Sequence, residues 1–591
     1  MKKKYCFILF YMFFLSVTAQ NAPGYLVGEV INATSGEPYP AANVVVSKDG
    51  DFYAAIRINE DGTYKIPQGL EPRKYEISLG IRELGNVPVC DVTIESDKTS
   101  VLNIMVGENY VDSDNLPFPE IPRETYKYIK ENDFIKVSYN PVSTFSSDVD
   151  AASYGVVKSF IETRQKLPPK YITRIEELIN YFDYNYPNNN EEDKTFLVYS
   201  EYSDCPWNSE TRLLHVAITS AERKIKRKTQ NNLVFLIDVS GSMQSPEKLP
   251  LVKDALKMLI EELDSQDEIA IVIYAGASGL FLPSTPISQK ERIIESIEKL
   301  EAGGSTAGAE GIQLAYKIAL ENYNIEGNNR IILVTDGDFN VGVTSDAELV
   351  DMIKENRKSN IYITIAGFGY GNYQDNKLEE ISNAGNGNYF FINDKQEVRK
   401  FFVDGVEGVL NVAAKDVKFQ IEFNPYQIAE YRLIGYENRH LENQDFADIT
   451  KDAGDVGIGM SVTAIYEVKP VNNNKIKPQQ DRYRKTEYKD SSSFEEEIAF
   501  FKISYLPPWD TAQKIVSTAI IDNHIPWSNS SDRFKLSACV GLYGMLLNNS
   551  KYSSQGSYDT ILHEIKSLTP DSKEIEQFFN LVAKTKMLSE L

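Results

Sequence analysis

The sequence predicts a multidomain protein of the α/β class: a mostly parallel sheet with helices on both faces, flanking β-sandwich modules and a C-terminal helical segment. Three observations lead to this fold class. Residues 231–410 alternate short β-branched runs with longer segments of helical periodicity. Residues 24–107 and both flanks of the central region carry strand patterns, and residues 509–591 are mainly helical. A chain of 591 residues is long enough for about three to five domains.

The central region, residues 231–410, supplies the α/β pattern. Its first helical segment places Leu251, Ala255 and Leu259 on one face at helical spacing. Strands that alternate with helices of this length form parallel sheets, whose ligands lie beyond the carboxyl ends of the strands. The predicted strands are 233–237, 269–274, 331–335, 361–368 and 388–392, and the predicted helices are 248–263, 289–300, 309–323, 347–357 and 395–410.

Five side chains with hard oxygen atoms follow strands or precede helices of this region. Asp238, Ser240 and Ser242 come directly after the first apolar run. Thr306 precedes a helical segment, and Asp336 closes another apolar run. Mg²⁺ prefers about six oxygen ligands and retains some of its waters. Because only two of these side chains are negatively charged, a bound dication would accept one more anionic oxygen from outside. The pattern predicts a divalent-cation site, and the alternative is a solvated polar loop without metal.

The ordered set Asp-x-Ser-x-Ser, Thr and Asp-Gly resembles the metal-ion-dependent adhesion site (MIDAS) of von Willebrand factor type A (VWA) domains, which have a Rossmann-like α/β fold. The resemblance implies that Asp238, Ser240, Ser242, Thr306 and Asp336 hold Mg²⁺, or Mn²⁺ or Ca²⁺ in its place. It also implies a protein partner that presents an Asp or Glu to the metal. In related domains the last helix moves when ligand engages the ion, and residues 395–410 occupy the matching place.

The segment 24–107 has the spacing of strands and turns expected of a small β-sandwich. It resembles the carboxypeptidase regulatory-like domains of bacterial envelope proteins, which are non-catalytic modules. The resemblance is carried by Gly28-Glu29-Val30, Ser35-Gly36-Glu37-Pro38, Ala42-Asn43-Val44 and Asp61-Gly62-Thr63-Tyr64.

The regions on either side of the central domain resemble the corresponding parts of the YfbK-like family of bacterial VWA proteins. Residues 108–133, rich in proline and acidic groups, are predicted to be a linker. The flanks 134–230 and 411–508 are expected to form one β-sandwich into which the VWA domain, 231–410, is inserted. The helical region 509–591 follows. The resemblance to this family rests on Ser143-Thr144-Phe145-Ser146-Ser147-Asp148-Val149-Asp150, Arg174-Ile175-Glu176-Glu177-Leu178 and Asp452-Ala453-Gly454-Asp455-Val456-Gly457.

Two acids in the first flank, Asp148 and Asp150, carry a choice of roles. They would suit a second cation, and the competing interpretation is a cap at the start of a helix beside Ala151. The capping interpretation is favoured, because short acidic side chains are common at helix starts.

The first residues set the expected compartment. Three lysines precede a short apolar stretch that ends in small residues, which is typical of a secretory signal peptide over residues 1–20. The stretch is short for a transmembrane helix, although an uncleaved anchor is the alternative. The mature protein is expected in the periplasm, at the cell surface or secreted, with no integral membrane segment after cleavage. Among Cys90, Cys205 and Cys539 one disulfide could form, or the thiols could be buried and free.

The charge and the scattered histidines exclude several functions. Acidic residues outnumber basic ones, 85 to 62, which argues against nucleic acid as a partner. The four histidines form no zinc motif, no phosphate-binding loop occurs, and no catalytic residue or further cofactor site is predicted. We expect a binding protein that is not an enzyme. The alternatives are an envelope scaffold in which the VWA fold is not a metal-gated binder and, more remotely, a Mg²⁺-dependent hydrolase using Asp238.

Overall fold

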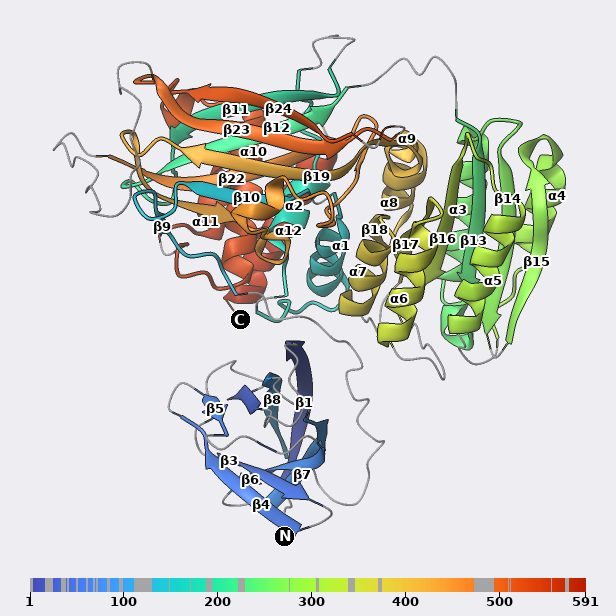
Figure 1. Ribbon diagram of the computed structural model, residues 1–591, viewed down its shortest axis with the longest axis horizontal. Coiled ribbons are helices and arrows are strands. Elements are labelled where there is room, and N and C mark those ends of the chain that lie inside the picture. The colour runs from blue at the N-terminus through green and yellow to red at the C-terminus, as the bar shows by residue number, and fades with distance from the viewer. Residues whose placement is uncertain are drawn as a thin grey trace. The chain divides into compact units, whose positions relative to one another are not determined.

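The computed structural model of the chain divides into two compact units, Met1–Ile121 and Pro122–Leu591 (Figure 1). The residues that the structure describes are 4–15, 25–32, 39, 42–48, 51–59, 62–66, 70, 73–81, 85–94, 99–110, 130–147, 149–170, 172–187, 194–221, 229–275, 277–303, 308–337, 346–369, 375–471, 494–508, 510, 512–553, 555–568 and 573–590.

The first unit contains two four-stranded sheets, with strand orders β1-β8-β2-β5 and β4-β3-β6-β7. Alternating apolar residues such as Val44, Tyr75 and Leu102 are buried in one cluster, as expected when each strand turns one face to a core. The predicted signal peptide includes β1, which pairs antiparallel with β8; its removal on export stays a prediction. The strands are β1 Lys4–Leu15, β2 Tyr25–Asn32, β3 Ala42–Lys48, β4 Asp51–Arg57, β5 Thr63–Lys65, β6 Lys74–Ile81, β7 Gly85–Thr93 and β8 Thr99–Tyr110.

The central domain of the second unit is built on a six-stranded sheet in the order β15-β14-β13-β16-β17-β18. All neighbouring strands are parallel except β15, which pairs antiparallel with β14. The central strand β13 is buried along its whole length, which explains its uninterrupted apolar sequence. The strands are β13 Asn231–Asp238, β14 Glu268–Ala275, β15 Ala277–Pro286, β16 Asn328–Thr335, β17 Ile361–Phe368 and β18 Tyr389–Ile392.

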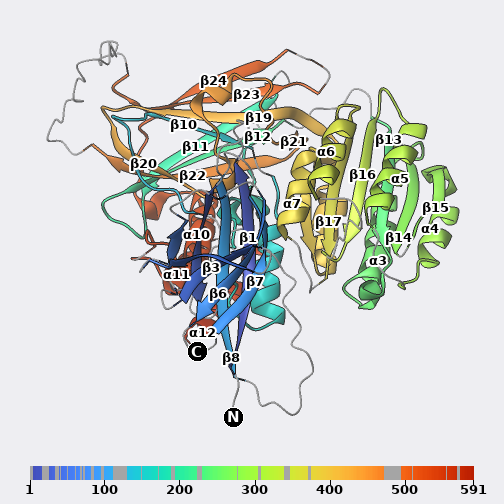
Figure 2. The same cartoon turned by 60° about the horizontal axis from the view of Figure 1, so that its bottom comes forward.

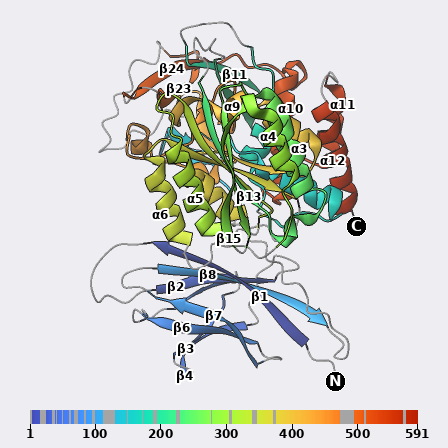
Figure 3. The same ribbon diagram turned by 90° about the vertical axis from the view of Figure 1, so that its right-hand side faces the viewer.

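Helices cover both faces of this sheet (Figure 3). Leu233, Phe235 and Ile237 pack with the helices α3 and α4 in one cluster. Val234 and Leu236 face the opposite way, toward α5, α6 and α7. This alternation on a single strand is what two covered faces require. The helices are α3 Leu249–Glu262, α4 Lys290–Glu298, α5 Gly308–Glu321, α6 Asp346–Arg357 and α7 Asp375–Ala384.

The last helical segment of the domain differs from the prediction of one helix over 395–410. The structure breaks it into α8 Lys395–Arg399, the π-helical turn η4 Lys400–Asp404 and α9 Val406–Leu410. The Gly405 N–H bonds to the Lys400 carbonyl at 2.9 Å, so one extra residue is accommodated before the chain enters the next strand.

Strands from both flanks pair with one another, and the sheets that they form lie to one side of the inserted domain (Figure 2). One sheet has the order β10-β19-β23-β24, with β21 paired to β19, and the other has the order β11-β12-β22-β20-β9. Phe145, Phe419 and Phe501 of the first sheet share one buried cluster with Val216 and Ala464 of the second. We call these two sheets the frame. Its strands are β9 Ile135–Lys136, β10 Val142–Ser146, β11 Phe196–Asp204, β12 Arg212–Ser220, β19 Val412–Phe423, β20 Ile428–Ile434, β21 Val456–Gly457, β22 Ser461–Pro470, β23 Glu497–Leu506 and β24 Lys514–Ile521.

The C-terminal region, residues 509–591, was predicted to be mainly helical, and the structure adds a strand at its start. It begins with β24, whose β-branched residues pair antiparallel with β23 at the edge of the sheet. Helices follow, and α10 is buried on nearly all sides, so it lacks a polar face. The remaining helices are α1 Ala152–Lys158, η1 Ser159–Thr163, α2 Ile175–Tyr181, α10 Asp532–Leu547, α11 Tyr558–Ser567 and α12 Lys573–Ser589.

Two cysteine side chains and the last residues of the predicted linker lie within the described part of the chain. Cys205 and Cys539 are buried and free, and burial raises the pKa of the Cys205 thiol to about 12, so this thiol is unreactive. The side chain of Cys90 and most of the predicted linker lie outside the described residues. The linker's last residues contact the frame, since the Asn132 amide donates to the Gly435 carbonyl at 2.9 Å. No helix among the described residues is long and apolar enough to cross a membrane.

Candidate functional site

Asp238 is the last residue of β13 and is fully buried. Its Oδ1 atom accepts a hydrogen bond from the Ser240 N–H at 2.7 Å. Its Oδ2 atom is buried and has no hydrogen-bond donor in normal geometry within the described part of the chain. Burial is the largest cause that raises the pKa of Asp238 to about 6. Ser240 lowers this pKa through its hydroxyl and its N–H, the charge of Asp336 raises it, and the Tyr274 hydroxyl lowers it. An acceptor oxygen at the carboxyl end of a buried strand thus has no donor in normal geometry among the described residues.

Ser240 and Ser242 follow in the turn after β13. Their hydroxyl oxygens lie 2.9 Å apart, and Ser240 is buried whereas Ser242 is exposed. The turn is held by the buried side chain of Met243, whose N–H bonds to the Ser240 carbonyl at 3.0 Å. The two hydroxyls therefore stand together at the surface end of the strand, beside the carboxylate of Asp238.

Asp336 lies one residue beyond the end of β16 and is 1% exposed. The strands β13 and β16 are parallel neighbours, with Ile237 opposite Val334, so Asp238 and Asp336 end adjacent strands at the same edge of the sheet. Asp336 Oδ2 accepts a hydrogen bond from Lys248 Nζ at 2.8 Å. The two predicted acids therefore meet where ligands of a parallel sheet are expected.

Lys248 is the residue of the site that sequence reasoning missed. Besides Asp336 it contacts the serine turn, because its Nζ donates to the Ser242 carbonyl at 3.0 Å. It lies at the N-cap of α3, where a positive charge opposes the helix dipole and an acidic or hydroxyl residue is preferred. That misplaced charge is the one signal in the sequence that could have pointed to it.

Thr306 lies outside the described residues, so its place in the site stays a prediction. The segment before it is anchored nearby, since the Gly303 N–H donates to the Val239 carbonyl at 2.7 Å. The helix α5 begins at Gly308, just after Thr306. Among the described residues no group of three or more His, Cys, Asp or Glu side chains is placed to hold a metal. A site here must therefore rely on hydroxyl oxygens as well as the two acids.

Asp150 has neither of the roles predicted for it. Its Oδ1 atom accepts a hydrogen bond from the Tyr389 N–H at 2.8 Å, and its Oδ2 atom pairs with Arg439 at 3.1 Å. Ala151 is the N-cap of α1 and has no side-chain capping bond. A backbone donor of β18 and the Arg439 guanidinium satisfy the two oxygens, so Asp150 joins β18 to the turn that follows β20. Asp148 lies outside the described residues.

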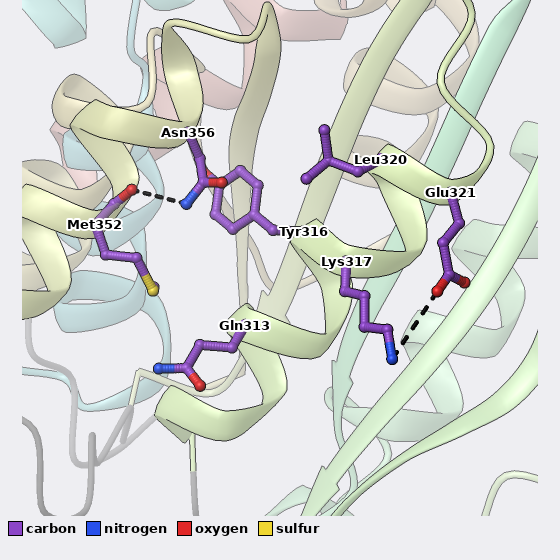
Figure 4. Close-up of a pocket in the computed structure, with 7 residues that line it drawn as sticks. All are labelled: Gln313, Tyr316, Lys317, Leu320, Glu321, Met352 and Asn356. Atoms are coloured by element: carbon purple, nitrogen blue, oxygen red, sulfur yellow. Dashed lines mark hydrogen bonds and ion pairs between the residues drawn. The ribbon is translucent and has the colours of Figure 1, made fainter.

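A surface groove of about 410 Å³ lies between α5 and α6 of the central domain (Figure 4). Its lining combines the Tyr316 ring with aliphatic and amide side chains, and Lys317 pairs with Glu321 at its rim. None of the four predicted metal ligands that the structure describes lines it. The groove is therefore separate from the edge of the sheet that carries Asp238.

Three family models match the chain. The model described as "von Willebrand factor" matches residues 120–215, "von Willebrand factor type A domain" matches 232–403, and "Uncharacterized protein YfbK, C-terminal" matches 408–588. The protein YfbK of Escherichia coli (strain K12) is 38% identical over 443 residues, which are 74% of this chain and 76% of that protein.

Solved structures give more distant likenesses. A von Willebrand factor type A structure from Catenulispora acidiphila covers 67% of this chain and 91% of that chain, with 15% identity and a TM-score of 0.38. Proximal thread matrix protein 1 from the mussel byssus, in a structure with a zinc-occupied MIDAS motif, covers 30% and 48%, with 20% identity and a TM-score of 0.26. VWA domains typically mediate protein–protein interactions, and they often bind a divalent metal at the MIDAS.

Proposed function

Because the chain belongs to the YfbK family and contains a VWA domain, we propose that it is an exported, metal-dependent protein-binding protein. Its MIDAS would hold Mg²⁺ or a similar divalent cation through Asp238, Ser240, Ser242, Thr306 and Asp336. An open position on the cation would accept an Asp or Glu of a protein partner.

The unpartnered Oδ2 atom of Asp238 is the observation that carries the proposal. A buried carboxylate oxygen without a donor costs about 1–3 kcal/mol or more, and its persistence at the end of β13 is explained if a cation satisfies it. The paired hydroxyls of Ser240 and Ser242 add neutral oxygens on the same side. Hard oxygen ligands of this mixed kind suit Mg²⁺, Mn²⁺ and Ca²⁺ better than softer metals.

The charge of the donor set favours an acidic partner. Asp238 and Asp336 supply the only carboxylates of the proposed ligand set, and Lys248 already neutralises part of the charge on Asp336. A bound dication would therefore keep positive charge that a partner's carboxylate balances. We propose a binding role without catalysis, because the four histidines of the chain, His215, His440, His524 and His563, lie outside the central domain and leave Ser240 without a histidine base.

Metal titration of the full chain tests the first half of the proposal. Chelator-treated protein is titrated with Mg²⁺ and Mn²⁺ in a calorimeter, and one site is expected, which Asp238→Ala abolishes. The matched control is Asp267→Asn at the opposite end of the sheet, where uptake should be unchanged. Absence of uptake by the wild-type protein would end the metal-dependent proposal.

Partner capture tests the second half. Tagged wild-type protein and Asp238→Ala are incubated with envelope extract in Mg²⁺ and in chelator, and the same partner should be captured only by the wild type in Mg²⁺. Capture that is equal in all four conditions would instead favour a scaffold whose VWA fold is not metal-gated.

Export and the nature of the first unit are parts of the same proposal. We propose that residues 1–20 are removed on export and that residues 24–107 form a non-catalytic module resembling carboxypeptidase regulatory-like domains. Two four-stranded sheets around a common cluster support the second point. Mass spectrometry of the protein isolated from the envelope should find a first residue beyond Ala19, and an intact Met1 would refute cleavage.

A further inference from the structure

Lys248 lies in a closely packed position beside the predicted metal ligands. Its ammonium group lies 2.8 Å from Asp336 Oδ2 and 3.0 Å from the Ser242 carbonyl oxygen, and only 10% of its side chain is exposed. Lysine is rarely buried to this degree unless it is paired. The ammonium group thus bridges two segments that both belong to the site.

The stem of Lys248 is positioned as closely as its charge. Gly369, which follows β17, has φ +75°, and a Cβ atom there would lie 2.4 Å from Lys248 Cγ. The backbone of Lys248 is also held, because its N–H bonds to the Ser245 carbonyl at 3.0 Å and its carbonyl accepts from Val252 at 2.9 Å. Gly369 has no side chain and therefore leaves room for the stem of Lys248. This close packing distinguishes the position of Lys248 from a chance surface ion pair.

The charges of the site give the lysine a specific consequence. Asp238 and Asp336 contribute two negative charges, and Lys248 contributes one positive charge in contact with Asp336. A dication bound to this set leaves the loaded site with one net positive charge. One carboxylate from a partner then brings the whole site to neutrality, which is the favourable outcome where charges are poorly solvated.

We propose that Lys248 is a specificity-determining positioning residue of the metal site. It weakens the binding of the cation and, in exchange, makes the loaded site select a partner that supplies a single carboxylate. This inference rests on the proposed function. It adds a reason why the site binds the cation less tightly and why the partner's ligand group carries one negative charge.

The test uses Lys248→Met, which keeps the length of the stem and removes the charge. Full-length wild-type and variant proteins are titrated with MnCl₂ alone, and the variant is expected to bind Mn²⁺ at least about tenfold more tightly, because a positive charge beside the cation is lost. Acetate, as the smallest carboxylate, is then titrated into both Mn²⁺-loaded proteins, with the relaxation of solvent water as the readout. The variant is expected to release less metal-bound water to acetate.

A purely structural role for Lys248 predicts the opposite sign. If the lysine only holds Asp336 in place, Lys248→Met misplaces a ligand and weakens Mn²⁺ binding, and unchanged or weaker binding overturns the proposal while leaving the proposed function intact. Absence of Mn²⁺ uptake by the wild type would instead remove the proposed function itself.

A second variant protects the test against misfolding. Lys248→Met removes the ion-pair partner of the buried Asp336, whereas Lys248→Met with Asp336→Asn restores the charge of the wild-type site. The double variant should fold in the absence of metal and should bind Mn²⁺ at least about tenfold more weakly than Lys248→Met. Equal Mn²⁺ affinity of these two variants would overturn the assignment of a charge role.

Discussion

Asp238→Asn should separate metal binding from the stability of the central domain. In the metal-free protein the buried Oδ2 atom of Asp238 has no hydrogen-bond donor in normal geometry among the residues that the structure describes. An Asn at this position is nearly isosteric and neutral, and its oxygen can still accept the Ser240 N–H. We expect the substitution to stabilise the metal-free domain by about 1–3 kcal/mol above pH 6, because it removes a negative charge whose burial raises the pKa of Asp238 to about 6. A functional site that lowers stability in this way is common in binding proteins.

The magnesium response should change in the opposite direction. A ligand present at about one hundred times its dissociation constant stabilises the native state by about 2.7 kcal/mol. The wild type should gain that amount in Mg²⁺, and Asp238→Asn should gain little. The measurement is hydrogen exchange followed by mass spectrometry on peptides that cover β13 and β16, in chelator and in Mg²⁺, because local protection reports on one domain of a multidomain chain.

The control for this experiment is a second buried acid of the same sheet, Asp267. Its two oxygens accept hydrogen bonds from the Asn231 and Asp264 N–H groups at 2.8 and 2.9 Å. Asp267→Asn should therefore lower protection by about 1–2 kcal/mol and leave the Mg²⁺ response unchanged. If Asp238→Asn also destabilised the metal-free domain, or kept the full Mg²⁺ response, the interpretation of the orphan oxygen as a cation ligand would be refuted.

Three further substitutions test the packing of the central domain and its flanks by chemical denaturation of the full chain. A Cβ at Gly387 would lie 1.7 Å from the Ile363 carbonyl oxygen, so Gly387→Ala should cost more than about 3 kcal/mol; a loss below about 1 kcal/mol would contradict that packing. Arg432→Met leaves the fully buried Glu467 without its 2.7 Å ion-pair partner, and a loss of about 3–5 kcal/mol is expected. Burial raises the pKa of Asp455 to about 7, so the folded state holds this proton where the unfolded state has released it. Stability should therefore fall as pH rises from 3.8 to about 7, and Asp455→Asn should remove that part of the pH dependence; an unchanged pH profile would contradict the shift.

The strand ends of the central domain could be predicted because the relevant information is local. The run 233–237 is apolar on both faces, which indicates a strand covered on both sides, and Asp238 is its first polar residue. Parallel pairing then brings the ends of neighbouring strands together without any long-range signal in the sequence. The structure places Asp238 and Asp336 at that edge, and the VWA family model covers the same residues.

Elements with weak local patterns were missed for physical reasons. The strand β15 contains Gly279 and Pro283 and forms the antiparallel edge of the sheet, with irregular register against β14. The strand β24 is also an edge strand and is largely exposed, so it lacks strict alternation. Edge strands depend on a partner more than on their own sequence, and a single-sequence reading therefore identifies them poorly.

Lys248 was missed for a different reason, because the residues that it contacts are far from it along the chain. Its partner Asp336 lies 88 residues away, and no periodicity or spacing connects the two. The space for its side chain depends on Gly369, which lies on a third segment of the chain. A lysine at the start of a helix is unfavourable for the helix alone, so its position is explained only when the tertiary contacts are known.

The exit from the central domain bears on whether metal binding is transmitted to the frame. The segment from α8 to α9 leads directly into β19, and both flanks hold it by ion pairs. Lys158 of α1 pairs with Asp394 at 2.5 Å and with Glu397 at 3.4 Å, while Lys400 pairs with Glu574 of α12 at 2.6 Å. If this helix moves on ligand engagement, as in related domains, the movement must break these pairs or carry α1 and α12 with it. Partly buried pairs of this kind are costly to separate. A shift of the helix would therefore reach α1 and α12 instead of remaining in the VWA domain.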